Sequence, residues 1–258
     1  MDLHLQGTRV VVSGAGAGIG LAITHAFVEE GAHVVAGSRS STDALDKLAE
    51  GGQVTVVEVD LSTPDGPQRL VDAAGAIDVL VNNVGAAPAR LDGFGAVTDE
   101  MWAATFELDL MAHVRAIRAA LPGMLDAGHG VVVTIGSVNA RLPDPVVVDY
   151  SAAKAALVNL SKSLSKEFGP RGIRFNAIDP GPVATDLWLG ENGMAAQAGR
   201  ASGQSPEDVA AAAAKGMVTG RFTRPDEVAD LVLLLASDRT ANVTGTDVVI
   251  DGGMITTT

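Results

Sequence analysis

Residues 9–20 read RVVVSGAGAGIG, a short β-branched run that leads directly into a glycine-rich turn. The run predicts a strand over Arg9–Ser13, and the apolar pattern after the turn predicts a helix over Ile19–Glu30. Glycines at such a junction permit a tight turn, and the amides of the helix N-terminus can bind a pyrophosphate. A purely structural turn is the alternative. The residues that we expect to contact a dinucleotide here are Ser13, Gly14, Gly16, Gly18 and Ile19.

The rest of the chain repeats this alternation of short β-branched runs with amphipathic or Ala-rich segments, which is typical of βαβ units. The further expected strands are His33–Gly37, Val54–Val59, Val79–Val81, Val131–Ile135, Arg174–Ile178 and Asp247–Ile250. The further expected helices are Thr42–Glu50, Gly66–Ala74, Glu100–Leu121, Val148–Phe168 and Asp226–Ala236. The pattern predicts an α/β fold: one Rossmann-type, doubly wound domain over residues 1–258, with a seven-stranded parallel sheet flanked by helices on both faces.

Residues 187–223 interrupt the alternation with several glycines around the Ala-rich run Val209–Ala214. The segment is long for a connection in a compact domain, and such segments are often lids. We expect a substrate lid that contains one or two short helices. A mobile surface insertion is the alternative.

The composition restricts the class of protein. The net charge of −13 argues against a general nucleic-acid surface, and the absence of cysteine excludes disulfides and thiolate chemistry. The five histidines form no spaced pair typical of a metal site, so we expect no metal. Neither a signal-peptide pattern nor a long apolar span is present, and the sequence therefore predicts a soluble, cytoplasmic protein without a membrane partner.

The end of the second expected strand indicates which dinucleotide is bound. An NAD site places a carboxylate there to bind the ribose 2′-hydroxyl, whereas this chain has Ser38-Arg39 and no acid. A guanidinium can bind a 2′-phosphate in bidentate fashion, so NADP(H) is predicted over NAD(H). The alternative is that Arg39 lies free in solvent. In Asp60-Leu61, after the third strand, Asp60 could bind the adenine amino group or cap its own turn.

Tyr150 and Lys154 lie four residues apart at the start of an expected helix, so their side chains are neighbours. A nearby ammonium favours the phenolate, which lowers the tyrosine pKa toward that of a general acid/base. Ser137 follows the Val-rich run and can bring a hydroxyl to the same site. Together with the dinucleotide loop, this trio indicates hydride chemistry.

These landmarks, in this order and spacing, resemble the short-chain dehydrogenases/reductases along essentially the whole chain, with a likeness to the 3-oxoacyl-carrier-protein reductase-like members. The landmarks are Gly14-x-x-x-Gly18-Ile19-Gly20, Asn82-Asn83-Val84-Gly85, Ser137, Tyr150-x-x-x-Lys154, the run 179–185 and Asp251-Gly252-Gly253. The resemblance implies that Ser137 polarises a carbonyl, Tyr150 transfers the proton and Lys154 binds the nicotinamide ribose. It further implies cofactor contacts from Asn82, which would brace the central strand near the adenine ribose, and from Gly85, Pro180, Gly181, Val183 and Thr185. A homo-tetramer is also implied.

Asp109 departs from the family pattern, because the family usually has asparagine here, where the local backbone holds a water that supplies protons to the lysine. An acid near Lys154 would raise the lysine pKa and weaken its effect on Tyr150. A nearly isosteric substitution with little effect is the alternative.

The sequence as a whole predicts an NADP(H)-dependent oxidoreductase that interconverts a ketone and a secondary alcohol. The alternatives are an NAD(H)-dependent alcohol dehydrogenase and a non-catalytic NADP-binding sensor on the same fold. The substrate could be a 3-oxoacyl thioester, a polyketide ketone, a sugar or a steroid. Apolar residues such as Trp188 and Met194 in the lid favour an apolar or mixed substrate over a bare sugar.

Overall fold

The computed structural model describes residues 1–256, and within them a single sheet of seven strands runs in the order β3-β2-β1-β4-β5-β6-β7. Every neighbouring pair of strands is parallel. The strands are β1 Arg9–Ser13, β2 His33–Ser38, β3 Val54–Glu58, β4 Val79–Asn82, β5 Gly130–Ile135, β6 Ile173–Pro180 and β7 Asp247–Ile250. The predicted fold class is confirmed, and the predicted strand bounds differ from the observed ones by a few residues at most.

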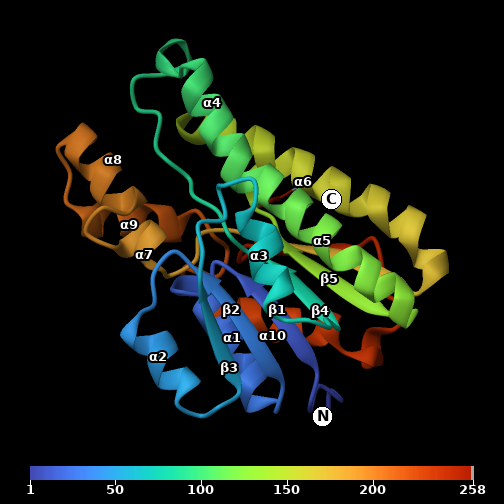
Figure 1. Cartoon of the computed structure of the whole chain (residues 1–258). Coiled ribbons are helices and arrows are strands. Elements are labelled where there is room, and N and C mark those ends of the chain that lie inside the picture. The colour runs from blue at the N-terminus through green and yellow to red at the C-terminus, as the bar shows by residue number, and fades with distance from the viewer. Residues whose placement is uncertain (257–258) are drawn as a thin grey trace.

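Helices cover both faces of the sheet (Figure 1). One layer contains α1 (Gly18–Glu29), α2 (Asp43–Ala49) and α10 (Pro225–Ala236), and the other contains α3 (Gly66–Asp72), α5 (Ala112–Ala127) and α6 (Val148–Phe168). Alternate residues of each strand face opposite layers. Val10 and Val12 accordingly pack into the α1 and α10 layer, and Val11 packs into the α3 and α5 layer. Strands buried on both faces explain the nearly continuous valine runs.

The chain reverses its direction of winding between β1 and β4. From β1 it proceeds outward through β2 and β3, and it then returns to place β4 on the other side of β1. The Ser13 hydroxyl joins the two strands, since it accepts hydrogen bonds from the backbone amides of Asn83 (2.9 Å) and Val84 (3.1 Å). Ligands of open α/β sheets bind at the carboxyl ends of the strands beside such a reversal.

The helix predicted over Glu100–Leu121 is wrong as a single element. The structure has α4 over Asp99–Phe106, one wider π-helical turn over Glu107–Met111, and then α5. Single π turns of this kind often occur at functional sites. Asp109 lies in this turn and is only 1% exposed.

The segment over residues 187–223 also differs from expectation, because it contains three helices in place of one or two. They are α7 (Asp186–Leu189), α8 (Met194–Ser202) and α9 (Pro206–Lys215), and they form a lobe beside the sheet in Figure 1. A bridge between Val183 and Thr223 closes the base of the segment. Short 3₁₀ helices lie at Phe94–Ala96, Val138–Ala140, Pro145–Val147, Gly169–Arg171 and Asp238–Thr240.

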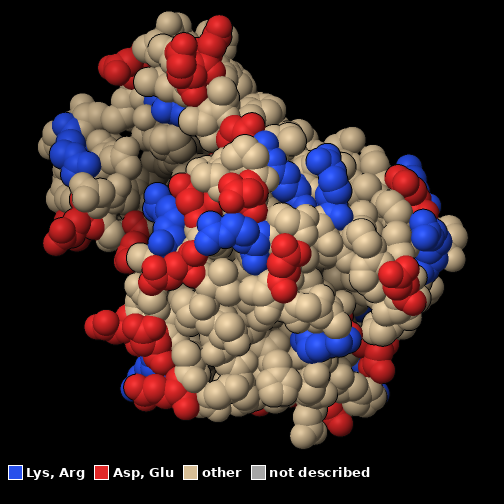
Figure 2. Space-filling model, in the orientation of Figure 1, with Lys and Arg blue, Asp and Glu red and all other residues tan. Residues whose placement is uncertain are grey.

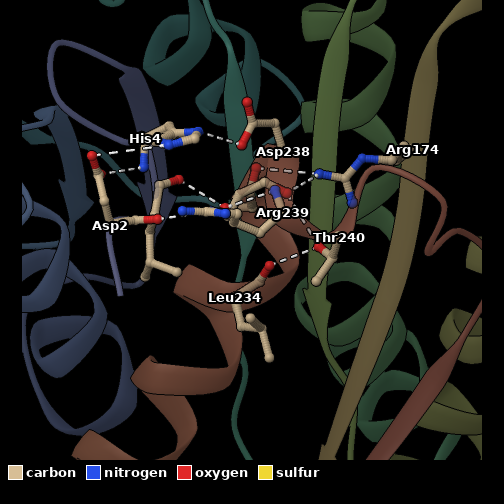
Figure 3. A network of polar contacts seen from close by, with 10 residues as sticks. Asp2, His4, Arg174, Leu234, Asp238, Arg239 and Thr240 are labelled. Carbon is tan, nitrogen blue, oxygen red and sulfur yellow. Dashed lines mark hydrogen bonds and ion pairs between the residues drawn. The ribbon is translucent and has the colours of Figure 1, made fainter.

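The amino-terminal segment is attached to the end of α10 by the polar network of Figure 3. His4 Nδ1 lies 2.9 Å from Asp238 Oδ1, and Arg239 Nε donates to the carbonyl of Asp2 at 3.0 Å. Arg174 of β6 donates to carbonyls at the end of α10, among them those of Leu235 and Ser237. Its guanidinium therefore satisfies acceptors that a helix C-terminus leaves without a partner. Over the described residues no helix has the length and apolar character needed to cross a bilayer.

Candidate active site

A cleft of about 910 Å³ extends along the carboxyl ends of the central strands. Most of the predicted cofactor residues line it. They are Gly14, Gly16, Gly18, Ile19, Ser38, Arg39, Asp60, Leu61, Gly85, Tyr150, Lys154, Pro180, Gly181, Val183 and Thr185. The predicted catalytic residue Ser137 lines the same cleft.

The glycines of the turn after β1 allow two backbone segments to approach each other closely. Gly14 has φ +68°, a conformation that other residues rarely adopt, and a Cβ there would lie 2.9 Å from the Cα of Val84. At Gly20 a side chain would overlap the carbonyl of Gly14. The helix α1 that follows has no side-chain cap and no acid in its first turn. Its first amides are therefore available to an anion in the cleft, and the helix dipole favours negative charge there.

Arg39 and Asp60 lie at the ends of neighbouring strands on one wall of the cleft. Arg39 is exposed, whereas the Asp60 carboxylate accepts hydrogen bonds from the Ser62 amide at 2.9 Å and the Ser62 hydroxyl at 2.7 Å. These two bonds, and the nearby charge of Arg39, hold the pKa of Asp60 below its usual value. The capping of the turn that was expected of Asp60 is present, and a contact with adenine stays a prediction.

Three predicted residues lie behind the cleft wall. Ser13 joins β1 to β4, as described above. The expectation for Asn82 needs correction, because its side chain is fully buried and lies 3.5 Å from the carbonyl of His113 on the α5 side of the sheet. Adjacent strand residues face opposite ways, and it is Asn83 that lines the cleft and donates to the carbonyls of Ser13 and Gly14 at 3.0 Å each. Asp109, the third, lies behind Lys154.

Ser137, Tyr150 and Lys154 converge on the cleft from two elements. Ser137 follows β5, while Tyr150 and Lys154 occupy successive turns at the start of α6. Lys154 Nζ lies 5.5 Å from the centre of the Tyr150 ring and donates to the carbonyl of Ile135 at 3.0 Å. Ser137 Oγ accepts from the Asn139 amide at 3.2 Å. A phenol, an ammonium and a hydroxyl thus share one pocket.

Burial, rather than the Lys154 ammonium, has the largest effect on the pKa of Tyr150. Burial raises the pKa of Tyr150 above its usual value, the charges of Asp109 and Asp179 raise it further, and only the Ser137 hydroxyl acts in the opposite direction. Burial also lowers the pKa of Lys154, against the opposing effect of the same two carboxyl groups. A phenol in apolar surroundings remains protonated because the buried phenolate would lose its hydration.

Asp109 lies directly beside this cluster. Its Oδ1 is 3.9 Å from Lys154 Nζ and accepts a hydrogen bond from the Ala86 amide at 3.1 Å. Burial raises the pKa of Asp109 to about 6, although the charge of Lys154 opposes the change. The predicted proximity of an acid to Lys154 is therefore present, and it brings a group that titrates near neutral pH.

The far end of the cleft has a largely apolar wall, and the sequence motifs indicate its lid residues but not those that follow Ser137. The residues of this wall that follow Ser137 are Val138, Asn139, Leu142, Pro143, Asp144, Pro145, Val146 and Val147. Leu187, Trp188, Met194 and Ala213 of the helical lobe face them, together with Met254. Trp188 packs edge-on against Phe222 at 5.4 Å between ring centres. Within residues 1–256, no cluster of His, Asp or Glu side chains is placed to hold a metal ion.

Comparison with known proteins agrees with this geometry. A family model described as "Enoyl-(Acyl carrier protein) reductase" matches residues 14–255. The chain is 33% identical to the 3-oxoacyl-[acyl-carrier-protein] reductase of Thermotoga maritima, over 98% of this chain and 100% of that protein. It is 35% identical to the L-xylulose reductase of Bos taurus, over the full length of both. The crystal structure of L-sorbose reductase from Gluconobacter frateurii, complexed with NADPH and L-sorbose, superimposes with a TM-score of 0.91 at 33% identity and covers 100% of each chain. The chain therefore belongs to the short-chain dehydrogenase/reductase family.

Proposed function

We propose that this chain is an NADP(H)-dependent oxidoreductase that interconverts a ketone and a secondary alcohol by hydride transfer. One observation carries the proposal: Ser137, Tyr150 and Lys154 line the same cleft as the glycine turn and the exposed Arg39. A dinucleotide laid along this cleft would place its phosphates at the N-terminus of α1. Its reactive ring would lie toward Tyr150.

The residues present fit a nicotinamide dinucleotide phosphate. The uncapped first turn of α1 offers amides to the pyrophosphate, and Arg39 offers a guanidinium where an NAD site would have a carboxylate. The bound nicotinamide supplies or accepts the hydride. Pro180, Gly181, Val183 and Thr185 would form its pocket.

The protein's part in the reaction is to hold the carbonyl and move one proton. The Ser137 hydroxyl would polarise the carbonyl oxygen, and the Tyr150 hydroxyl would donate its proton to that oxygen during reduction. Its high pKa in the free protein keeps Tyr150 in the acid form that reduction needs. Lys154 would hold the ribose and stabilise the phenolate that forms.

The helical lobe over residues 187–223 would act as the substrate lid, because four of its residues face the substrate end of the cleft. The apolar wall favours a ketone that carries an apolar or mixed group. The named substrates of two relatives, L-xylulose and L-sorbose, favour a polyhydroxylated ketone. Both classes therefore belong in the first substrate panel.

The test is the loss of reduced-nicotinamide absorbance with NADPH and, separately, NADH, across ketoses, diketones and 3-oxoacyl thioesters. We expect NADPH-selective turnover of one substrate class. Tyr150→Phe should reduce turnover by at least about 100-fold while NADPH binding is retained. Equal turnover with NADH would favour the NAD(H)-dependent alternative, and tight NADPH binding without turnover would favour the sensor.

Arg39 can be tested in the same assay. Arg39→Ala should raise KM for NADPH by about 10- to 100-fold, because a hydrogen bond to a charged group contributes about that factor to binding. It should change KM for NADH little. The matched control is Arg118→Ala, which removes an exposed arginine of α5 outside the cleft. Equal effects of Arg39→Ala on both cofactors would contradict the assignment of Arg39 to the 2′-phosphate.

A further inference from the structure

A buried carboxyl group lies directly behind the candidate catalytic serine. Asp179, near the end of β6, accepts a hydrogen bond at Oδ1 from the backbone amide of Ser137 at 3.1 Å. Asp179 is 0% exposed and Ser137 is 6% exposed. Gly136 makes the contact possible, since a side chain there would overlap Asp179 Oδ1. The position of the Ser137 backbone therefore depends on the Asp179 carboxyl.

A second carboxyl group approaches Asp179 from the neighbouring strand. Asp247 begins β7 and is aligned with Ala177, two residues before Asp179. Residues two apart on a strand share a face, so both acids point to the same side of the sheet. Arg141 covers the pair from outside: its guanidinium bonds to Asp247, and its Nε lies 3.8 Å from Asp179 Oδ2.

Two carboxyl oxygens of this cluster have no hydrogen-bond donor within residues 1–256. Asp179 Oδ2 and Asp247 Oδ1 are both buried, and neither has a hydrogen-bond partner in the described part of the chain. Ionised carboxylates only accept hydrogen bonds, so two of them in contact repel each other and leave these oxygens unsatisfied. A proton on one carboxyl turns it into a donor to the other. The same proton balances two carboxyl groups against the single guanidinium.

We propose that Asp179 and Asp247 share one proton in a carboxylic acid–carboxylate hydrogen bond, and that this pair, neutralised by Arg141, is a positioning element for Ser137. The inference rests on the proposed function only in the role that it gives to Ser137. Burial, followed by the charge of Asp247, raises the pKa of Asp179 to about 8, against the opposing effect of Arg141 and the Ser137 amide.

Loss of the shared proton would affect the site in two ways. Repulsion between the carboxylates would displace Asp179 and release the Ser137 amide. The added negative charge would also act on Tyr150 and Lys154, the two titratable groups of α6 that sense Asp179, and raise the pKa of each. A less acidic Tyr150 protonates a carbonyl oxygen more slowly. We therefore expect kcat for reduction to decline above about pH 8 in the native protein.

The positioning role is tested at Asp179. Asp179→Ala removes the acceptor of the Ser137 amide and should lower kcat roughly 10-fold, with KM for NADPH unchanged. Asp179→Asn keeps an oxygen at the same place and should restore most of the activity. If the two variants were equally active, Asp179 would not position Ser137.

The shared proton is tested at Asp247. In Asp247→Asn the amide supplies the missing hydrogen permanently, so the decline of kcat above about pH 8 should disappear. The matched control is Asp78→Asn, which removes a partly buried carboxylate that Arg9 holds at the amino-terminal ends of β1 and β4. It should leave the pH profile unchanged. Identical profiles for native protein and Asp247→Asn would overturn the proposal.

A carboxyl carbon-13 NMR titration of the free protein separates this proposal from the proposed function, because it needs no turnover. The native protein should show an aspartate signal that titrates near pH 8 and is absent from Asp247→Asn and Asp179→Asn. Absence of any aspartate that titrates above pH 7 would refute the shared proton, whether or not a substrate is found. A positive titration without any turnover would leave the pair intact and count against the enzyme.

Discussion

Two buried carboxyl groups, Asp109 and Asp179, oppose the effect of burial on the pKa of Lys154. Asp109 is 3.9 Å away on the π-helical side, and Asp179 acts on it from β6. Burial alone would favour the neutral amine, whereas the two acids favour the ammonium. Removal of one partner of a buried charge pair leaves the other uncompensated.

Asp109→Asn should lower the pKa of Tyr150 by about one pH unit, because the ionised carboxylate disfavours a nearby phenolate. Above its own pKa of about 6, Asp109 is charged and opposes ionisation of Tyr150. Tyr150 is the only tyrosine of the chain, so tyrosinate absorbance reports its titration directly.

The control for this experiment is Asp126→Asn, at an exposed acid of α5 far along the helix from the π turn. It should leave the tyrosinate titration unchanged. Superimposed titrations for the native protein and Asp109→Asn would show that the acid has no electrostatic effect on the site.

A buried ion pair attaches the segment after β4 to the start of α6. Arg90 Nε donates to Asp149 Oδ2 at 3.1 Å, the Arg90 amide donates to the carbonyl of Val146 at 2.7 Å, and Thr105 of α4 donates to the same Asp149 oxygen at 2.7 Å. Asp149 is 0% exposed and directly precedes Tyr150. Three elements are thus joined at the residue before the candidate general acid.

Arg90→Met should lower the free energy of unfolding by about 3–5 kcal/mol, because it leaves the Asp149 carboxylate buried without its counter-charge. The matched variant is Arg115→Met, which breaks an ion pair with the more exposed Glu107 and should cost no more than about 1 kcal/mol. Urea unfolding curves of the two variants provide the comparison. Equal destabilisation would mean that burial of Asp149 is not the cause.

At the scale of helices and strands, the sequence predicts most elements but not the points at which a helix is interrupted. Valine runs are sufficient to place the strands, because burial on both faces demands them. The π turn at 107–111 was missed because the apolar spacing over Glu100–Leu121 continues as in an uninterrupted helix. Asp179 and Asp247 were missed because only the register between β6 and β7 brings them together. The motif alone does not show that Asn83, rather than Asn82, faces the cleft.

Considered as a whole, the molecule is strongly acidic, with a net charge of −13. On the face shown in Figure 2, Lys and Arg side chains are interspersed with Asp and Glu rather than gathered into one basic surface. On this face, the distribution offers no broad basic surface to a polyanion. The homo-tetramer and the cytoplasmic location expected from the sequence stay predictions.

Three buried groups contribute to the pH dependence of stability, and their contributions have opposite signs. Asp109 and Asp179 have raised pKa values, so the folded protein keeps protons that the unfolded chain releases above about pH 4. Their contributions to stability therefore fall as the pH rises toward 6 and 8 respectively. Burial lowers the pKa of His113 to about 3, and its contribution therefore falls as the pH drops below about 6.5.

His113→Gln should remove the contribution of this histidine to the loss of stability at low pH. Between pH 6.5 and about 4.5, the unfolding free energy of the variant should therefore fall less than that of the native protein. The His113 Nε2 lies 2.7 Å from the carbonyl of Val84, so Nε2 carries the hydrogen, and a second proton would enter a fully buried site. Urea titrations at each pH measure the difference. The exposed His33→Gln is the control and should follow the native curve; a parallel His113→Gln curve would contradict the prediction.

The strand order also affects the chain during its synthesis on the ribosome. β1 lies at the centre of the sheet, yet 70 positions separate Ser13 from Asn83, its hydrogen-bonding partner just after β4. At a synthesis rate of about 5–20 residues per second, one edge of β1 remains open for roughly 4–14 s. Its valines and unpaired amides are then exposed to any extended segment nearby. We therefore expect that chaperones which hold extended apolar segments would protect the nascent chain until β4 is synthesised.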